Sequence, residues 1–156
     1  MTELDQNSWL RIVESDSQRS REILKDWMGI ADRTETIRNA IRNASQRGAA
    51  LRLLLVFDDE VRQNIFAELI EYCSWGHADI EICRRVIKTM PRDWVIANIE
   101  DAVNRLLDER SGDDEAFRRF AELYAELDER LVRSISLRAS ESSNESIREV
   151  GTDYCR

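Results

Sequence analysis

Residues that interrupt helices are scarce in this chain of 156 residues, which contains one proline and five glycines. So few breakers favour long helices over a β fold rich in turns. Long apolar runs are missing too, because the longest, from Leu53 to Phe57, is far too short to cross a bilayer. Residues 1–7 are polar and acidic and contain neither the basic nor the apolar region of a secretory signal. We therefore expect a helical protein that is neither secreted nor inserted into a membrane.

The residues that usually build catalytic or metal centres are equally sparse. His77 is the only histidine, and its spacing from Cys73 and Cys83 matches no zinc pattern, in which ligands pair about two to four residues apart. One histidine cannot supply a di-iron bundle, and no phosphate-binding glycine loop or serine-nucleophile motif occurs. Three cysteines without a pairing pattern indicate a reduced, cytoplasmic environment. The sequence predicts no metal, no other cofactor and no enzymatic activity.

Basic residues are outnumbered, since 23 lysines and arginines stand against 31 aspartates and glutamates, a formal net charge of −8. An acidic surface repels phosphate groups, so nucleic acids and anionic membranes are disfavoured as partners. A basic protein is compatible with this charge. Lys25 and Lys88 are the only lysines, and this bias towards arginine is typical of a GC-rich bacterial genome.

Apolar residues recur every three or four positions along nearly the whole chain, which predicts amphipathic helices. Caps, glycines and Pro91 divide the pattern into eight or nine helices joined by short turns. We expect Ser17 to cap the second helix, Gly48 to end the third, and Ser142 with Glu145 to form a capping box for the last. The expected helices lie near residues 9–13, 17–28, 34–47, 49–57, 59–74, 80–90, 91–110, 114–139 and 147–155.

Two short segments resemble each other and open expected helices. Asp58-Asp59-Glu60-Val61-Arg62 places acidic residues before an aliphatic residue and an arginine, and Asn144-Glu145-Ser146-Ile147-Arg148-Glu149 is similar. This pattern resembles the opening of a HEAT-type repeat, and Thr36-Ile37-Arg38-Asn39-Ala40 echoes it. Val61 and Ile147 are 86 residues apart, or two units of 43, within the ~40–47 of such repeats. At the middle position, Ala102-Val103-Asn104-Arg105 lacks the acidic step.

The resemblance implies an all-α fold in which antiparallel helical pairs stack as a short HEAT-like α-solenoid. It covers residues 58–156, while residues 1–57 contribute N-terminal helices that are less repeat-like. No linker long enough to separate domains occurs, so residues 1–156 are expected to form a single domain. A non-repetitive helical bundle is the alternative arrangement of the same helices.

Stacked helical pairs present a groove to other proteins without needing reactive side chains. We therefore expect a non-catalytic protein-interaction module or scaffold, and its charge favours a basic protein as the partner. The oligomeric state stays open. The expected binding surface is an acidic stretch formed by Glu100, Asp101, Asp108, Glu109, Asp113, Asp114 and Glu115.

Two alternatives remain open. A small acidic inhibitor, such as an immunity protein or an antitoxin, would neutralise a basic partner through the same charge complementarity. Some HEAT-type proteins are DNA glycosylases, and here Trp75 and Trp94 lie near Asp79 and Asp93 in the sequence. The acidic surface disfavours DNA, so this enzymatic alternative ranks last.

Overall fold

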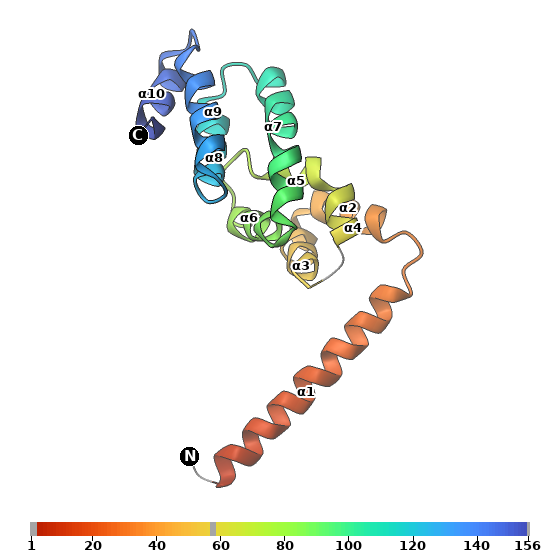
Figure 1. The fold of residues 1–156 in the computed structure, drawn as a ribbon. Helices are drawn as coiled ribbons and strands as arrows, with labels where there is room; N and C mark the ends of the chain where they lie inside the picture. Colours follow the sequence, from red (N-terminus) through yellow and green to blue (C-terminus); the bar gives the residue numbers. More distant parts are fainter. Residues whose placement is uncertain (1–2, 57–58, 156) are drawn as a thin grey trace. The chain divides into compact units, whose positions relative to one another are not determined.

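The computed structural model describes residues 3–56 and 59–155, and these ranges contain ten helices and no strand (Figure 1). The expected all-α fold class is confirmed. None of the described helices is both long and apolar enough to cross a membrane. The helices are α1 (Glu3–Met28), α2 (Arg33–Arg42), α3 (Ala44–Leu54), α4 (Asp59–Asn64), α5 (Phe66–Tyr72), α6 (Ile80–Thr89), α7 (Arg92–Glu109), α8 (Asp114–Ala125), α9 (Glu129–Ser140) and α10 (Glu145–Tyr154).

The chain divides into two compact units, one that ends at Thr36 and one that begins at Ile37. Helix α1 belongs to the first unit, and helices α3 to α10 belong to the second, larger unit. The two units are described separately below.

Helix α1 is continuous over 26 residues, where two helices were expected. Ser17 lies in its interior, so its expected role as a helix cap is wrong. No glycine or proline occurs within the helix, so nothing in the backbone forces a break. The helix ends where expected, because the N–H of Gly29 donates to the carbonyls of Lys25 and Asp26 at 3.1 Å.

Short polar side chains divide two of the expected helices. Asn43 accepts a hydrogen bond from the N–H of Ser45 and caps α3, so Gly48 lies inside that helix instead of ending one. Asp128 accepts from the N–H of Arg130 and caps α9, so the longest expected helix is in fact two helices, α8 and α9. Asparagine and aspartate offer the backbone N–H an alternative to the helical bond, which favours a new cap at these positions.

Two further boundaries differ from the expectation. The helix expected near residues 59–74 is interrupted at Ile65, whose φ of −115° and ψ of 17° are not helical, and becomes α4 and α5. The capping box of Ser142 and Glu145 is wrong, because Asn144 caps α10 by accepting from the N–H of Ser146 at 3.0 Å. Asp58, the other residue expected to cap the helix after residue 57, lies outside the described residues.

Several boundaries agree with the sequence patterns. Helix α6 ends before Pro91, and Met90 takes the extended conformation that a following proline favours. The apolar stretch beginning at Ala49 is helical through Leu54. The larger unit closes around fully buried side chains from most of its helices, including Leu51, Leu69, Ile87, Ile99, Leu107, Phe120 and Ile147.

Hydrogen bonds between side chains join α5, α7 and α9, which lie two apart in the chain order. Arg110, the residue after α7, donates to Glu71 of α5, and Ser134 of α9 donates to Glu100 of α7. These two pairs are 39 and 34 residues apart in sequence.

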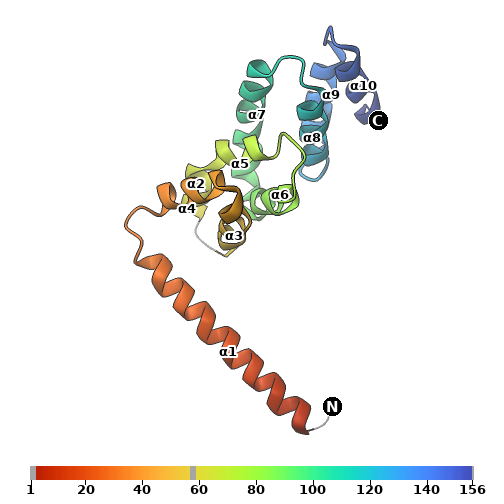
Figure 2. The ribbon, with the colours of Figure 1, turned by 180° about the vertical axis from the view of Figure 1, so that it is seen from behind.

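Figure 2 labels α6, α8 and α10 in the larger unit. A second series of hydrogen bonds joins these three helices in the same way. Arg84 of α6 donates to Glu122 of α8, and Arg118 of α8 donates to Asp153 of α10. These pairs are 38 and 35 residues apart in sequence. In this series, each helix is therefore bonded to the second helix after it in the chain.

Candidate functional site

The seven acidic residues that the sequence singled out lie on α7, in the turn after it and at the start of α8. Glu100 and Asp113 are half-buried, and the other five are exposed. We call this set the acidic face. It consists of Glu100, Asp101, Asp108, Glu109, Asp113, Asp114 and Glu115.

Two carboxylates of the acidic face hold α9 against α7. Glu100 accepts a hydrogen bond from the Ser134 hydroxyl, and Asp108 accepts from the Arg138 guanidinium at 2.6 Å. The same guanidinium donates to the side chain of Asn104 on α7. Replacing Glu100 or Asp108 therefore alters internal packing as well as surface charge.

Two other carboxylates of the acidic face shape the start of α8. Asp113 is the N-cap of α8, because its side chain accepts from the N–H of Ala116 at 3.1 Å. Glu115 accepts from the backbone N–H of Gly76 at 2.9 Å and lies 3.6 Å from the Arg119 guanidinium. These acids fix the turn between α7 and α8 and the loop after α5.

Asp101, Glu109 and Asp114 are the remaining members of the acidic face. All three are exposed, and within the described ranges their carboxylates make no hydrogen bond or ion pair with another residue of the chain. A carboxylate that is solvated and uncommitted can bind a cationic side chain without breaking an internal contact. These three residues are therefore the part of the acidic face that is open to a partner.

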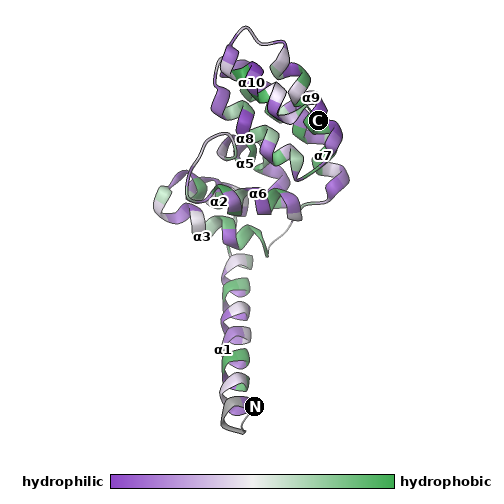
Figure 3. Cartoon of the chain, turned by 90° about the vertical axis from the view of Figure 1, so that its left-hand side faces the viewer, coloured by the Kyte–Doolittle hydropathy of each residue, from purple (hydrophilic) through white to green (hydrophobic). Residues whose placement is uncertain are grey.

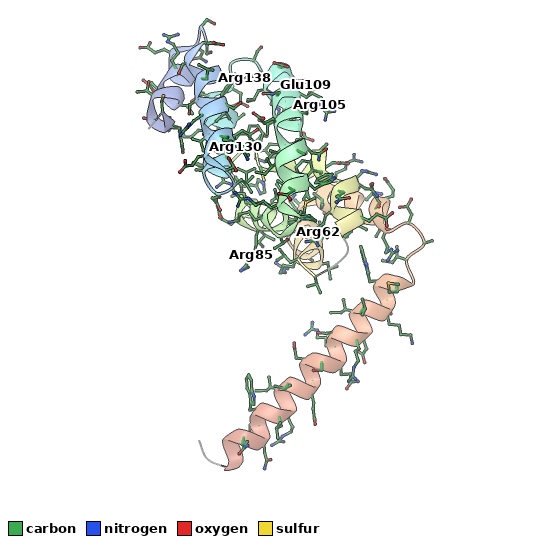
Figure 4. All side chains as sticks on the ribbon, in the orientation of Figure 1. Arg62, Arg85, Arg105, Glu109, Arg130 and Arg138 are labelled. Carbon is green, nitrogen blue, oxygen red and sulfur yellow. The ribbon has the colours of Figure 1, made fainter. Side chains whose placement is uncertain are left out.

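A groove of about 170 Å³ lies between α5 and α7 beside the acidic face. Glu109 and Arg105 line one side, where Figure 4 labels them on α7, and Glu68 and Glu71 line the other. Glu68 and Glu71 are each paired with an arginine of the larger unit. Glu109 is thus the groove carboxylate whose charge is not already compensated by an ion pair.

A second depression lies between α7 and α9 and is lined by Glu100, Asp128, Arg130 and Ser134. Hydrogen bonds from the side chain and backbone of Arg130 lower the pKa of Asp128 to about 2. Asp128 therefore stays ionised at neutral pH, but its charge is matched by Arg130. This depression offers less net negative charge than the groove at Glu109.

The residues weighed as metal or catalytic centres have structural roles. The N–H of Asp79 donates to Nδ1 of His77, so Nε2 carries the ring hydrogen and donates to the carbonyl of Tyr72 at 2.7 Å. Cys73 and Cys83 are buried, and a hydrogen bond between them, together with burial, raises the pKa of the Cys73 thiol. In residues 3–56 and 59–155, no group of three His, Cys, Asp or Glu side chains is arranged to hold a metal ion.

The two tryptophans of the glycosylase alternative pack in different aromatic clusters. Trp94 contacts Phe66 edge-on with ring centroids 5.0 Å apart, while Trp75 packs against Tyr72 with centroids 5.4 Å apart. The guanidinium of Arg110 lies over the Trp75 ring. Both tryptophans thus serve local packing.

Sequence reasoning missed a second surface, on α1. It divided this helix in two at Ser17. The signal that could have found it is the absence of any breaker between the apolar residues near both ends of the helix. Figure 3 shows hydrophobic patches on α1 separated by hydrophilic stretches. Seven large apolar side chains of α1 are between 40% and 64% exposed, and we call them the apolar face. They are Trp9, Leu10, Ile12, Val13, Ile23, Leu24 and Met28.

Comparisons of the chain with protein-family models, with curated proteins and with solved structures find no match.

Proposed function

We propose that the chain is a non-catalytic protein-interaction module that binds a basic segment of another protein through the acidic face. The observation that carries this proposal is the position of Asp101, Glu109 and Asp114, which are exposed and uncommitted within the described ranges. Their neighbours on the acidic face hold α7 to α9 and to the loop after α5. The helix that carries Asp101 and Glu109 is therefore held in place before binding. This preorganisation lowers the entropic cost of binding a partner.

We further propose that residues 37–156 form a short solenoid of antiparallel helical pairs. Its support is the repeated sequence separation of 30–39 residues in the bonds that join α5, α7 and α9 and those that join α6, α8 and α10. Sequence separations within a narrow range are expected when each helical pair packs on the next. In a non-repetitive bundle, the separations would differ from one pair of helices to another. In the solenoid, α7 lies in the middle of one row, flanked by α5 and α9.

A basic segment would bind mainly through arginine or lysine side chains that reach Asp101, Glu109 and Asp114. Charge complementarity of this kind increases the association rate and rejects acidic competitors. Because these carboxylates are exposed, salt screens the attraction over about 8–10 Å at moderate ionic strength. The inhibitor alternative uses the same surface and differs only in the identity of the partner, a single toxic basic protein.

Charge reversal tests the placement without disturbing internal bonds. Asp101→Lys with Glu109→Lys changes the charge of the open carboxylates and breaks no hydrogen bond or ion pair of the described residues. Glu60→Lys with Glu149→Lys is the matched control, because both residues are exposed and lie on α4 and α10. Wild-type protein and both variants are used as bait in a native lysate at low and at high salt, and retained proteins are identified by mass spectrometry.

We expect one basic protein to be retained by the wild type and by the control, lost with the α7 variant, and weakened at high salt. Retention of the same protein by the α7 variant would show that the acidic face is not the binding surface. Absence of any specific partner at both salt concentrations would contradict the interaction proposal itself.

A further inference from the structure

Helix α1 is amphipathic, and its apolar side is exposed to solvent. Leu10, Val13, Ser17, Ser20 and Leu24 follow the alternating three- and four-residue spacing of a coiled-coil seam. Trp9, Ile23 and Met28 flank this seam, and Ile12 lies further round the helix. The positions directly opposite the seam are polar, at Ser8, Ser15 and Glu22. Trp27, which is 4% exposed, is already buried and is left out of this surface. An isolated amphipathic helix is marginal in water unless its apolar face is buried, so the exposed apolar side chains of α1 call for a partner.

We propose that this partner is α1 of a second copy of the chain, paired in the antiparallel direction as a two-helix coiled coil. The proposal is independent of the function assigned to the acidic face. It makes the protein a homodimer joined through its N-terminal helices.

The charges of α1 favour a second copy in the antiparallel direction. Residues 3–16 contain four acidic residues and one basic residue, whereas residues 17–28 contain three basic residues and two acidic ones. An antiparallel pair places the acidic half of each helix beside the more basic half of the other. A parallel pair would place the two acidic halves together and Asp16 near its own copy, which costs free energy. The slight net negative charge of α1 also argues against an anionic membrane as the occupant.

One antiparallel register aligns apolar with apolar and small with small. In it, Val13 lies opposite Leu24 of the second copy, and Ser17 lies opposite Ser20 of the second copy. The small serine side chains at the centre of the seam allow the two helices to approach closely. At each end of the seam, Val13 of one helix packs against Leu24 of the other. Glu14 then lies beside Arg21 of the second copy, and the two-fold symmetry repeats this pair at the other end.

The length of α1 suits such a seam. A helix of 26 residues is about 39 Å long at ~1.5 Å per residue. The seam from Leu10 to Leu24 covers just over two heptads, and α1 extends beyond it at both ends. The apolar clusters at the ends lie within this length, so both form contacts in the same dimer.

The first test is the mass of the full chain in solution, measured by light scattering and sedimentation over a concentration series. We expect the wild type to dimerise with increasing concentration, and Val13→Glu with Leu24→Glu to remain monomeric. Ser8→Glu with Ser15→Glu adds the same charge to the polar side of α1 and should dimerise like the wild type. A wild type that is monomeric at all concentrations, or a control that fails equally, would overturn the proposal. Circular dichroism and urea unfolding confirm that each variant keeps the larger unit folded.

A charge swap tests the register. Glu14→Arg places arginine beside Arg21 of the second copy and should raise the dimer dissociation constant by roughly tenfold. Glu14→Arg combined with Arg21→Glu restores the pairing, so dimerisation should recover. Because each single substitution lies on the exposed side of α1, recovery in the double variant excludes a general loss of structure. Failure of the double variant to recover would contradict the antiparallel register.

Cysteine cross-linking tests the direction. In a Cys155→Ser background, Val13→Cys combined with Leu24→Cys should form disulfide-linked dimers on mild oxidation, because these positions face each other across the seam. Val13→Cys alone should not cross-link. Efficient cross-linking of Val13→Cys alone would show a parallel pair and overturn the proposal, as would a wild-type chain that captures a different protein through α1 and never itself.

Discussion

The guanidinium of Arg84 on α6 donates a hydrogen bond of 2.6 Å to the carboxylate of Glu122 on α8. The Arg84 side chain is only 6% exposed, and it also donates to the backbone carbonyl of Arg119 at 3.1 Å. Burying a cation is costly unless its partners surround it. This buried pair holds α6 to α8, together with the pair of Lys88 on α6 and Glu126 at the end of α8.

Replacing Arg84 should destabilise the larger unit. Arg84→Ala leaves Glu122 without its main partner and opens a gap between α6 and α8, so the free energy of unfolding should fall by about 2–3 kcal/mol. This lies below the ~3–5 kcal/mol of fully buried pairs, because Glu122 keeps some contact with water. Arg85→Ala, on the neighbouring exposed side chain (Figure 4), is the matched control and should change stability by less than ~0.5 kcal/mol. Equal urea midpoints for the two variants would contradict this account.

The same pair predicts how stability depends on pH. Burial alone would raise the pKa of Glu122, but hydrogen bonds from Arg84 and Arg119 outweigh it and lower the pKa below 4.5. A carboxylate whose pKa is lower in the folded state stabilises the protein above its unfolded pKa, and this contribution is lost as the pH falls through the folded pKa. The free energy of unfolding should therefore decrease below about pH 4.5. Glu122→Gln should show a shallower decrease in urea unfolding, whereas the exposed Glu149→Gln should follow the wild type.

Much of the fold follows from apolar periodicity and capping residues, as in α6 and α7, whose shared boundary Pro91 marks. The breaks at Asn43 and Asp128 do not follow from periodicity, because the apolar residues on both sides face the same core and the pattern continues across the break. Whether a polar residue caps a helix or lies within one is decided by tertiary packing, which a single sequence does not encode locally.

In the candidate site, too, some features were predictable from the sequence and others were not. The positions of the acids on α7 were predictable, because neighbouring turns of a helix share a side. Which acids are already bound was not predictable, since Asp108 is held by Arg138, 30 residues away. Glu115 is likewise held by Gly76, 39 residues away. The exposure of the apolar face of α1 is also a property of the folded chain, and apolar spacing alone does not distinguish a core-facing side from a solvent-facing one.

Adjacent aspartates of the acidic face should behave differently. Asp113→Ala removes the N-cap of α8 and should lower the free energy of unfolding by about 1 kcal/mol. Asp114→Ala removes the same charge from the next position, where the carboxylate makes no internal hydrogen bond among the described residues, so its effect should stay below ~0.5 kcal/mol. Thermal and urea unfolding at neutral pH measure both. A larger loss for Asp114→Ala would show that the cap has been assigned to the wrong residue.

The three thiols should differ in reactivity. Cys155 is exposed, whereas Cys73 and Cys83 are buried, and the hydrogen bond with Cys83 and the burial raise the pKa of the Cys73 thiol. Thiolates react and thiols do not, so a disulfide reagent should label one cysteine per native chain at mildly alkaline pH. Cys155→Ser should abolish this rapid labelling, and denaturant should expose all the cysteines of either protein. Rapid labelling of the native Cys155→Ser variant would contradict the burial of Cys73 and Cys83.

Gly151 on α10 packs directly against the backbone of α9, and replacing it should reverse the usual effect of glycine-to-alanine substitution. In an exposed helix interior, alanine is favoured over glycine by about 1 kcal/mol. Here a Cβ atom would lie 2.6 Å from the Ser140 hydroxyl oxygen and 2.9 Å from both the Ser136 carbonyl and the Ser140 amide nitrogen. The backbone atoms cannot move aside without separating the two helices, so Gly151→Ala should lower the free energy of unfolding by about 1–3 kcal/mol.

Adding Ser140→Ala removes only the hydroxyl contact and should not restore stability, while Glu149→Ala on the exposed side of α10 should be nearly neutral. If Gly151→Ala instead stabilised the protein against urea, the close contact between α9 and α10 at Gly151 would be contradicted.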